Sequence, residues 1–247
     1  MDLRRKLLGL LGFGGFGRLV AQHLYPHFDI MVRDPSCDIA RLRDGTELPL
    51  VALEQLAACD VIVLAVPVSQ IRASCVALAP HLSPGTIIVD VGSVKMAPIA
   101  AMVECLPDHA QVVGTHPLFG PQSAMQGLVG RKLTLCPVRG EAWRAVRIFL
   151  ARQLGLKVVT CPAEEHDREV AVVQGLTHLI AKVLVDMGPL PSRMTTASFD
   201  LLKEAIEMVK DDPPTVLHAI EAANPFAAEV REAFFDRAEA LRRRFET

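Results

Sequence analysis

A glycine-rich turn after the first apolar segment constrains the fold of this chain more than any other feature. The segment Leu7–Leu11 has the composition of a buried strand, and Gly12-Phe13-Gly14-Gly15-Phe16-Gly17 follows it directly. In this G-x-G-x-x-G spacing the first glycine permits a tight turn and the second lets backbone amides approach a pyrophosphate. The third permits close packing of the following helix, whose N-terminal amides bind phosphate oxygens. We therefore expect Gly12, Gly14, Gly15, Phe16 and Gly17 to bind a dinucleotide.

Beyond this turn, short apolar runs alternate with amphipathic segments over roughly the first 160 residues, a pattern typical of strands separated by helices. The expected strands are Lys6–Leu11, Ile30–Asp34, Val61–Val66, Thr86–Val91, Val112–Thr115, Leu133–Cys136 and Val158–Cys161. The expected helices are Phe16–Leu24, Leu53–Ala58, Ser69–Leu78, Ala97–Cys105 and Ala142–Leu154. This order predicts an α/β fold with a Rossmann-type, doubly wound and mostly parallel sheet.

The last third of the chain has a different pattern, because its apolar residues recur at helical spacing. Gly188–Ser192 and Asp211–Pro214 are expected to interrupt long helices, and the stretch Pro225–Phe245 has one charged and one apolar face. We predict a dinucleotide-binding domain over residues 1–162 and a smaller all-helical domain over residues 163–247. A helical piece of this size is small for independent stability, so it is expected to pack on the first domain, on a second copy, or on both.

Composition limits the expected partners and the cellular setting. The net charge is -2, with one Trp and one Tyr, which argues against nucleic-acid and anionic membrane partners. The six cysteines are scattered without a close pair at metal-ligand spacing, so we expect neither a metal nor disulfides, and a reducing, cytoplasmic setting. Arg4-Arg5 before the apolar Leu7 also resembles a secretory or twin-arginine signal, but the glycine spacing favours a strand. No apolar run elsewhere reaches the ~18 residues that span a bilayer.

An acidic residue at the end of the second expected strand bears on the choice of cofactor. Asp34 lies 22 residues after Gly12, where a carboxylate accepts hydrogen bonds from a ribose diol and repels a 2′-phosphate. NAD is therefore the preferred cofactor. The neighbouring Arg33 leaves NADP open, because a guanidinium also binds phosphate.

Further polar residues follow strand ends, where ligands gather in a doubly wound sheet. Val66-Pro67 ends the third expected strand and is assigned to the cofactor site. Ser93 and Lys95 follow the next strand and are expected beside the nicotinamide. The competing interpretation of Ser93 is a cap for the helix that starts near Met96.

The segment 114–123 reads Gly-Thr-His-Pro-Leu-Phe-Gly-Pro-Gln-Ser and places His116 in a loop at the end of an apolar strand. An imidazole fixed there takes a proton near neutral pH, because its unperturbed pKa is ~6.5. Together with a dinucleotide turn, it suggests hydride transfer coupled to removal of a hydroxyl proton. His178 also lies among apolar residues, and a structural role is as well supported for it as a functional one.

Three groups of residues together resemble the arogenate/prephenate dehydrogenase family, and most of all its plant-type branch. They are Val91-Gly92-Ser93-Val94-Lys95, Thr115–Ser123, and Glu165–Arg168 with Gln174–His178. These motifs occur in the order and spacing of the family, and the resemblance covers nearly the whole chain. It implies oxidative decarboxylation of a cyclohexadienol: hydride leaves C4 for the nicotinamide, the C4 hydroxyl loses its proton, and the ring carboxylate departs as CO2.

The resemblance also implies roles for residues by matching position. His116 accepts the hydroxyl proton, Ser93 orients the histidine or the hydroxyl, and Gln174, Thr177 and His178 line the substrate pocket. In the plant-type branch an acid near the start of a later helix accompanies preference for arogenate, whose ammonium replaces the keto group of prephenate. That position falls on Asp212 here. The competing interpretation is that residues 211–214 form a polar turn that caps the next helix.

Two departures from the family pattern matter. Many bacterial relatives bear an Arg in the helical domain that binds a substrate carboxylate, but this chain has none between Arg193 and Arg231. The carboxylate contact is therefore expected to be missing, or to be replaced by Lys95, Arg193 or backbone amides. Plant-type relatives commonly have Ser where this chain has Asp34, which matches their use of NADP, so the departure favours NAD. The family further implies a homodimer formed through the helical domain.

These observations predict oxidation of L-arogenate to L-tyrosine with NAD(P). The alternative is a prephenate or dual-specificity cyclohexadienyl dehydrogenase that gives 4-hydroxyphenylpyruvate. Outside the family, a β-hydroxyacid dehydrogenase would need Lys182 as its catalytic lysine and leaves the His116 loop unexplained. The presence of both Ser93 and His116 argues against a non-catalytic nucleotide sensor.

Overall fold

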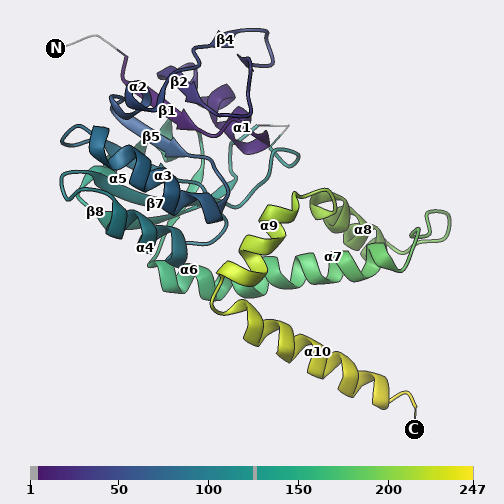
Figure 1. The fold of residues 1–247 in the computed structure, drawn as a ribbon. Coiled ribbons are helices and arrows are strands. Elements are labelled where there is room, and N and C mark those ends of the chain that lie inside the picture. Colours follow the sequence, from purple (N-terminus) through teal and green to yellow (C-terminus); the bar gives the residue numbers. More distant parts are fainter. Residues whose placement is uncertain (1–4, 125–126, 247) are drawn as a thin grey trace. The chain divides into compact units, whose positions relative to one another are not determined.

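The structure is a computed structural model that describes residues 5–124 and 127–246 (Figure 1). The possible signal peptide begins with residues 1–4, which include Arg4, and these residues lie outside the described part of the chain. Contacts between residues divide the chain into two compact units, Met1–Ala163 and Glu164–Thr247. We call them unit 1 and unit 2.

Unit 1 is built on a seven-stranded sheet in the order β2-β1-β5-β6-β7-β8-β9. The strands are β1 (Leu7–Leu11), β2 (Asp29–Arg33), β5 (Val61–Leu64), β6 (Ile87–Asp90), β7 (Gln111–Pro117), β8 (Lys132–Arg139) and β9 (Lys157–Thr160). All neighbours pair in parallel except β7 and β8, which are antiparallel. The prediction of a mostly parallel, Rossmann-type sheet is confirmed. The strand order reverses at β1, so the carboxyl ends of β1, β2 and β5 meet where such sheets bind ligands.

Helices cover both faces of this sheet, as the doubly wound prediction requires. They are α1 (Gly15–Leu24), α2 (Leu53–Ala57), α3 (Ile71–Leu78), α4 (Met96–Cys105) and α5 (Ala142–Arg152), with short 3-10 turns η1 (Val68–Gln70) and η2 (Ala79–His81). Side chains alternate along each strand, so Val63 and Val89 join the core beneath α1 and α5. Ile62 and Ile88 join the core beneath α2, α3 and α4.

A small antiparallel pair, β3 (Ala40–Arg41) with β4 (Glu47–Leu48), was not predicted. Each of its strands has two residues, which is too short for an alternating pattern to be recognised. The other expected strand ends lie within two residues of those in the structure, the usual uncertainty of element ends, except that β8 runs to Arg139 rather than Cys136.

Unit 2 consists of helices in its described residues. They are α6 (Ala163–Val170), η3 (Ala171–Gly175), α7 (Leu176–Asp186), α8 (Ala197–Val209), α9 (Pro214–His218), η4 (Ala219–Ala223) and α10 (Ala227–Arg243). The interruptions predicted around residues 188–192 and 211–214 separate α7, α8 and α9. The segments η3 and η4 are π-helical turns, which the sequence pattern did not reveal. None of the described helices is long and apolar enough to cross a membrane.

Candidate active site

The glycine turn between β1 and α1 has the geometry that a dinucleotide pyrophosphate requires. Gly12 has a φ of +97°, and a Cβ atom there would lie 2.5 Å from the carbonyl oxygen of Ala65. A Cβ at Gly17 would lie 2.2 Å from the carbonyl oxygen of Gly12. At Gly14, by contrast, no atom lies within 4 Å of the Cβ position. The first and third glycines therefore allow close packing, whereas the second faces open space.

The start of α1 is suited to an anion. Its N-cap is Gly14, and no side chain caps the first turn. The amides of that turn are thus not satisfied by a cap and point towards the open space. Gly15 and Phe16 belong to this turn, and Gly15 is exposed. These residues fit the phosphates of a dinucleotide.

The end of β2 is fixed against the glycine turn by hydrogen bonds. The Gly12 amide donates to the Arg33 carbonyl at 2.9 Å, and the Phe13 amide donates to Asp34 Oδ2 at 2.7 Å. The Ser36 amide donates to the other oxygen, Oδ1, at 2.8 Å. Asp34 therefore holds its carboxylate next to the turn. Since each carboxylate oxygen has two lone pairs, it retains acceptor capacity for a ribose hydroxyl.

The remaining cofactor residues gather at the same edge of the sheet. Val66 and Pro67 are half-buried and come directly after β5 and Ala65, whose carbonyl faces Gly12. Ser93 is half-buried beyond the end of β6. The cap interpretation for Ser93 is wrong, because α4 begins at Met96 with Lys95 as its N-cap residue and no side-chain cap.

His116 lies within β7 rather than in the loop that the sequence predicted. It pairs with Thr134 of β8, and its neighbour Pro117 pairs with Leu133. The antiparallel strand β8 extends β7 by these two residues, and the earlier prediction ended the strand at Thr115 because a proline follows. His116 is 4% exposed, so its imidazole is held by the sheet.

The loop that follows His116 packs against the glycine turn. The Cβ position of Gly15 is 3.7 Å from Cγ of Pro121. The rings of Phe16 and Phe119 are 6.4 Å apart. The loop after the histidine strand and the dinucleotide turn are therefore neighbours in unit 1.

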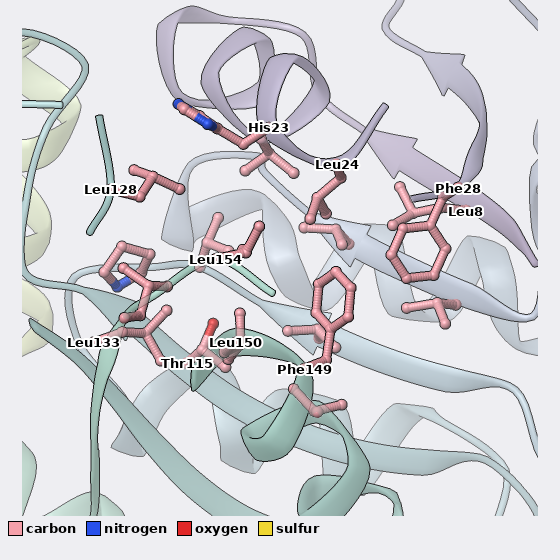
Figure 2. Close-up of a pocket in the computed structure, with 18 of the residues that line it drawn as sticks. Leu8, His23, Leu24, Phe28, Thr115, Leu128, Leu133, Phe149, Leu150 and Leu154 are labelled. Carbon is pink, nitrogen blue, oxygen red and sulfur yellow. The ribbon is translucent and has the colours of Figure 1, made fainter. Parts of the chain in front are cut away.

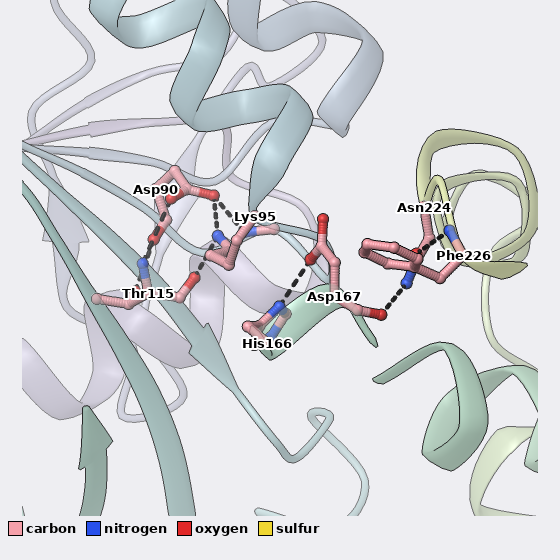
Figure 3. Close-up of polar contacts among 8 residues, drawn as sticks. Asp90, Lys95, Thr115, His166, Asp167, Asn224 and Phe226 are labelled. Atoms are coloured by element: carbon pink, nitrogen blue, oxygen red, sulfur yellow. Dashed lines mark hydrogen bonds and ion pairs between the residues drawn. The ribbon is translucent and has the colours of Figure 1, made fainter. Parts of the chain in front are cut away.

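Lys95 does not occupy the position expected of a substrate ligand. Its side chain is completely buried, and its ammonium is ion-paired with the equally buried Asp90 (Figure 3). It also donates to the Thr115 carbonyl at 2.6 Å. Burial raises the pKa of Asp90, although the Lys95 charge and the amides of Gly92 and Thr115 oppose this rise. Lys95 therefore anchors the residue before His116, and the sequence could not show the partner that buries it.

In unit 2 the predicted substrate residues His178 and Asp212 contact each other. His178 Nδ1 lies 2.9 Å from the Gln174 carbonyl oxygen, and Nε2 lies 3.1 Å from Asp212 Oδ2. Both partners are acceptors, so a doubly protonated imidazolium satisfies both contacts. The cap interpretation for residues 211–214 is wrong for Asp212, because the N-cap of α9 is Pro213 and no side chain caps that helix.

The pKa of His178 is raised above its ordinary value. Burial alone would lower it, but the hydrogen bonds to Asp212 and Gln174 and the charges of Asp212 and Glu221 outweigh this effect. The Asp212 side chain is 29% exposed, so its carboxylate stays accessible. Thr177 is engaged elsewhere, since its hydroxyl donates to the Val173 carbonyl at 2.6 Å.

Two further polar groups of unit 2 have contacts that the sequence did not show, although His166 and Asp167 belong to the motif Glu165–Arg168 named above. Glu221 in η4 accepts from Arg231 at 2.8 Å, and its other oxygen is buried and faces Gly175 in η3. His166 Nδ1 lies 2.7 Å from Asp167 Oδ1, and both side chains are buried. Asn224 donates to the Asp167 carbonyl at 2.8 Å (Figure 3). An acid between apolar residues, as at Glu221, is the signal that could have indicated the first of these groups.

The described residues contain no group of three or more His, Cys, Asp or Glu side chains placed to hold a metal ion. Arg193, the other replacement suggested for a carboxylate-binding Arg, is exposed between α7 and α8. No contact of its side chain links it to the His178–Asp212 pair in the described structure.

Comparisons with known proteins match both units to one family. The nucleotide-binding domain of prephenate dehydrogenase matches residues 40–160, and the dimerization domain of prephenate dehydrogenase matches residues 162–246. A probable arogenate/prephenate dehydrogenase of Methanocaldococcus jannaschii is 26% identical over 93% of this chain and 54% of its own length. Arogenate dehydrogenase 2 of Arabidopsis thaliana is 28% identical over 91% of this chain and 66% of its own length.

A solved structure is similar in fold. Prephenate dehydrogenase from Aquifex aeolicus, in complex with hydroxyphenyl propionate and NAD+, gives a TM-score of 0.74 at 21% identity and covers 98% of this chain and 91% of that one. The chain spans 54% and 66% of the lengths of the two curated relatives. An archaeal and a plant protein match about equally well, so the plant-type branch stays a prediction.

Proposed function

Because this chain belongs to the prephenate dehydrogenase family, we propose that it transfers a hydride from a cyclohexadienol carboxylate to a nicotinamide cofactor, with loss of CO2. The observation that supports this most directly is the shared site of unit 1. The strand that carries His116 and the strand β1, which leads into the glycine turn, lie in one sheet, and Pro121 in the loop after His116 lies next to Gly15. A proton acceptor beside a hydride acceptor is what the oxidation of an alcohol requires.

In this proposal His116 accepts the proton of the C4 hydroxyl as the hydride leaves, and Ser93 orients the hydroxyl by a hydrogen bond. The bound cofactor supplies the hydride acceptor. Lys95 is a positioning residue, because it holds the Thr115 carbonyl next to His116. Replacing His116 by Gln is expected to lower kcat by about 10²–10⁴-fold with NAD still bound. Unchanged turnover would contradict the role of His116.

NAD is the cofactor that we propose. Asp34 is supported in this role by its position, since its carboxylate already binds the Phe13 amide within the glycine turn. A 2′-phosphate at that place would meet a negative charge. Arg33 keeps NADP as the alternative, and parallel assays with both cofactors decide between them.

For the substrate, we propose arogenate and assign its ammonium to Asp212. His178 occupies Asp212 Oδ2, which leaves Oδ1 of a partly exposed carboxylate for a second donor. Prephenate is the alternative, and one observation favours it. His178 Nε2 contacts Asp212 Oδ2 at 3.1 Å, so a protonated His178 would compensate the charge of Asp212, and a cation there also suits a substrate carboxylate.

The assignment is tested by steady-state assays of arogenate and prephenate with the wild type and with Asp212→Asn. If Asp212 binds the ammonium, the kcat/KM for arogenate falls about 10- to 100-fold, as expected for one charged hydrogen bond, while that for prephenate stays constant or rises. Asp211→Asn is the matched control and should change neither value by more than about twofold. An equal loss for both substrates would show that Asp212 acts only through His178.

We also propose a homodimer formed through unit 2. The match to a dimerization domain supports it, as do apolar side chains left exposed on its helices. These include Val183, Val185, Leu201, Met208, Phe235 and Leu241. Light scattering should give twice the mass of the chain, and a monomeric mass at micromolar concentration would contradict the proposal.

A further inference from the structure

A partly open cavity of about 280 Å³ lies in unit 1, between the sheet and the helices α1 and α5. Its walls are almost entirely apolar and come from all three elements. They include Leu8, Val63, Val89, Leu133, Phe149 and Leu150. Figure 2 shows Leu24 from α1, Phe149 from α5 and Leu133 from β8 pointing into the same space. None of the residues assigned to substrate lines it, and of the cofactor residues only Phe16 does.

The cavity follows from the unequal covering of the two faces of the sheet. Seven strands about 4.8 Å apart span about 29 Å from the first axis to the last, whereas two helices each cover about 10 Å. The face with α2, α3 and α4 has three helices, whereas among the described residues the other face has the helices α1 and α5 and the loop with Ala124 and Leu128. β5 and β6 lie in the middle of the sheet, and the cavity is lined by their Val61, Val63, Ile87 and Val89 and by Val91, which directly follows β6. The gap is therefore part of the topology.

The ends of the cavity differ in character. At one end lie Phe16, Pro117 and Phe119, and all three are apolar. At the other end lie Leu8 and Phe28, next to the exposed Lys6. No carboxylate in the described part of the chain pairs with the Lys6 ammonium. His23 also lines the cavity, but burial and then the charge of Arg43 lower its pKa, so Lys6 supplies the positive charge.

We propose that this cavity binds a medium-chain alkyl carboxylate, with the chain along β5 and β6 and the carboxylate at Lys6. A 150 Å³ apolar cavity stays dry and accepts benzene, so 280 Å³ holds a molecule of roughly twice that size. From Ile87 to Val91 the strand direction covers about 13 Å at ~3.3 Å per residue, which is the length of an extended chain of about ten carbons. An unbranched chain with one anionic end therefore matches the volume, the length and the single cation.

Decanoate is the probe that tests this assignment, by isothermal titration with the full-length protein below the micelle concentration. We expect saturable binding of one decanoate per chain. Val63→Phe places a ring in the cavity and should abolish binding, and Val146→Phe does the same from α5, in case the first variant does not fold. Ile62→Met, on the opposite face of the same strand, is the control and should bind as the wild type does. An absence of saturable binding, or binding that survives in a folded filling variant, would overturn the proposal.

The head group is tested separately with 1-decanol, which has the same chain without the charge. Lys6→Gln should weaken decanoate binding about three- to tenfold and leave 1-decanol within twofold. Lys157→Gln removes an exposed lysine from β9 and should change neither ligand. Equal weakening of both ligands by Lys6→Gln, or of neither, would refute the carboxylate contact at Lys6.

Discussion

The ammonium of Lys95 and the carboxylate of Asp90 form an ion pair in which both side chains are completely buried. The pair joins the end of β6 to the start of α4. The Thr115 hydroxyl donates to the Asp90 carbonyl at 2.6 Å, and Lys95 donates to the Thr115 carbonyl. β6 and β7 are thereby fastened together immediately before His116. A charge that looked available to a substrate is in fact used to hold the strand of the proposed base.

Lys95→Met is therefore expected to destabilise the protein by about 3–5 kcal/mol, because it leaves the Asp90 carboxylate buried without its partner. The double variant Asp90→Asn/Lys95→Met should recover part of this loss, since no buried charge remains. Urea unfolding at pH 7 measures both values. If Lys95→Met unfolds within about 1 kcal/mol of the wild type and only the KM for substrate rises, Lys95 is a substrate ligand after all.

Gly14 and Gly12 should respond in opposite ways to an added methyl group. Gly14→Ala meets no atom within 4 Å, and its φ of -68° suits any residue, so the melting temperature should stay within about 2 °C. The methyl group would instead occupy the space of the pyrophosphate and raise the Kd for NAD at least about tenfold.

Gly12→Ala combines a φ of +97° with a contact of 2.5 Å to a backbone oxygen, and it should destabilise the fold by more than about 2 kcal/mol. Thermal melting measures the change in stability of each variant, and fluorescence titration with NADH measures the change in its cofactor affinity. Normal NADH affinity in a folded Gly14→Ala variant would exclude the glycine turn as the pyrophosphate site.

His178 should make stability depend on pH in a defined direction. Its pKa is raised in the folded protein, so its contribution is fully present below the unfolded value of ~6.5 and is lost as the pH rises through the folded value. The His178 contribution to the unfolding free energy should thus decrease from pH 6 to pH 8, and the difference between the wild type and His178→Gln isolates it from the opposite contribution of His23, whose pKa is lowered. Asp212→Asn removes the largest contribution that raises the pKa of His178 against the effect of burial. In this variant the decrease of the His178 contribution to the unfolding free energy with pH should therefore shrink or reverse.

An NMR titration of the His178 ring measures its pKa directly, with His178→Gln to assign the signal. We expect the wild-type midpoint above 6.5 and the Asp212→Asn midpoint below that of the wild type. A wild-type midpoint below 6.5 would mean that burial prevails and that the pair is not an imidazolium–carboxylate contact.

The sheet was predictable because each buried strand is an uninterrupted apolar run between turn residues, as in Val61–Leu64 and Ile87–Asp90. The glycine turn was predictable because its spacing has a local geometric cause. The burial of Lys95 was not predictable, since nothing in the sequence around Asp90 indicates that the two residues form an ion pair. The contact between His178 and Asp212 joins residues 34 positions apart, and only the packing of α7 against the residues before α9 brings them together.

The direction of β8 also could not be predicted from the sequence. Its apolar run identifies it as a strand but does not show whether it runs parallel or antiparallel to β7. The proline after His116 suggested that β7 ended earlier. The structure shows that antiparallel pairing with β8 keeps His116 in the sheet.

The π-helical turn η3 sets the rotational phase of the helix that carries His178. Such a turn contains one residue more than an α-helical turn, and each residue of an α-helix advances the side chains by about 100°. Relaxing Ala171–Gly175 to α-helical winding without changing its length would rotate everything on one side of the turn by about that angle. His178 could then no longer face Asp212 while His166 and Asp167 kept their buried positions. The extra residue is therefore compensated only while the turn stays π-helical, and a single-residue deletion within Ala171–Gly175 should be tolerated better than one within α7, where it rotates the side chains on one side by about 100°.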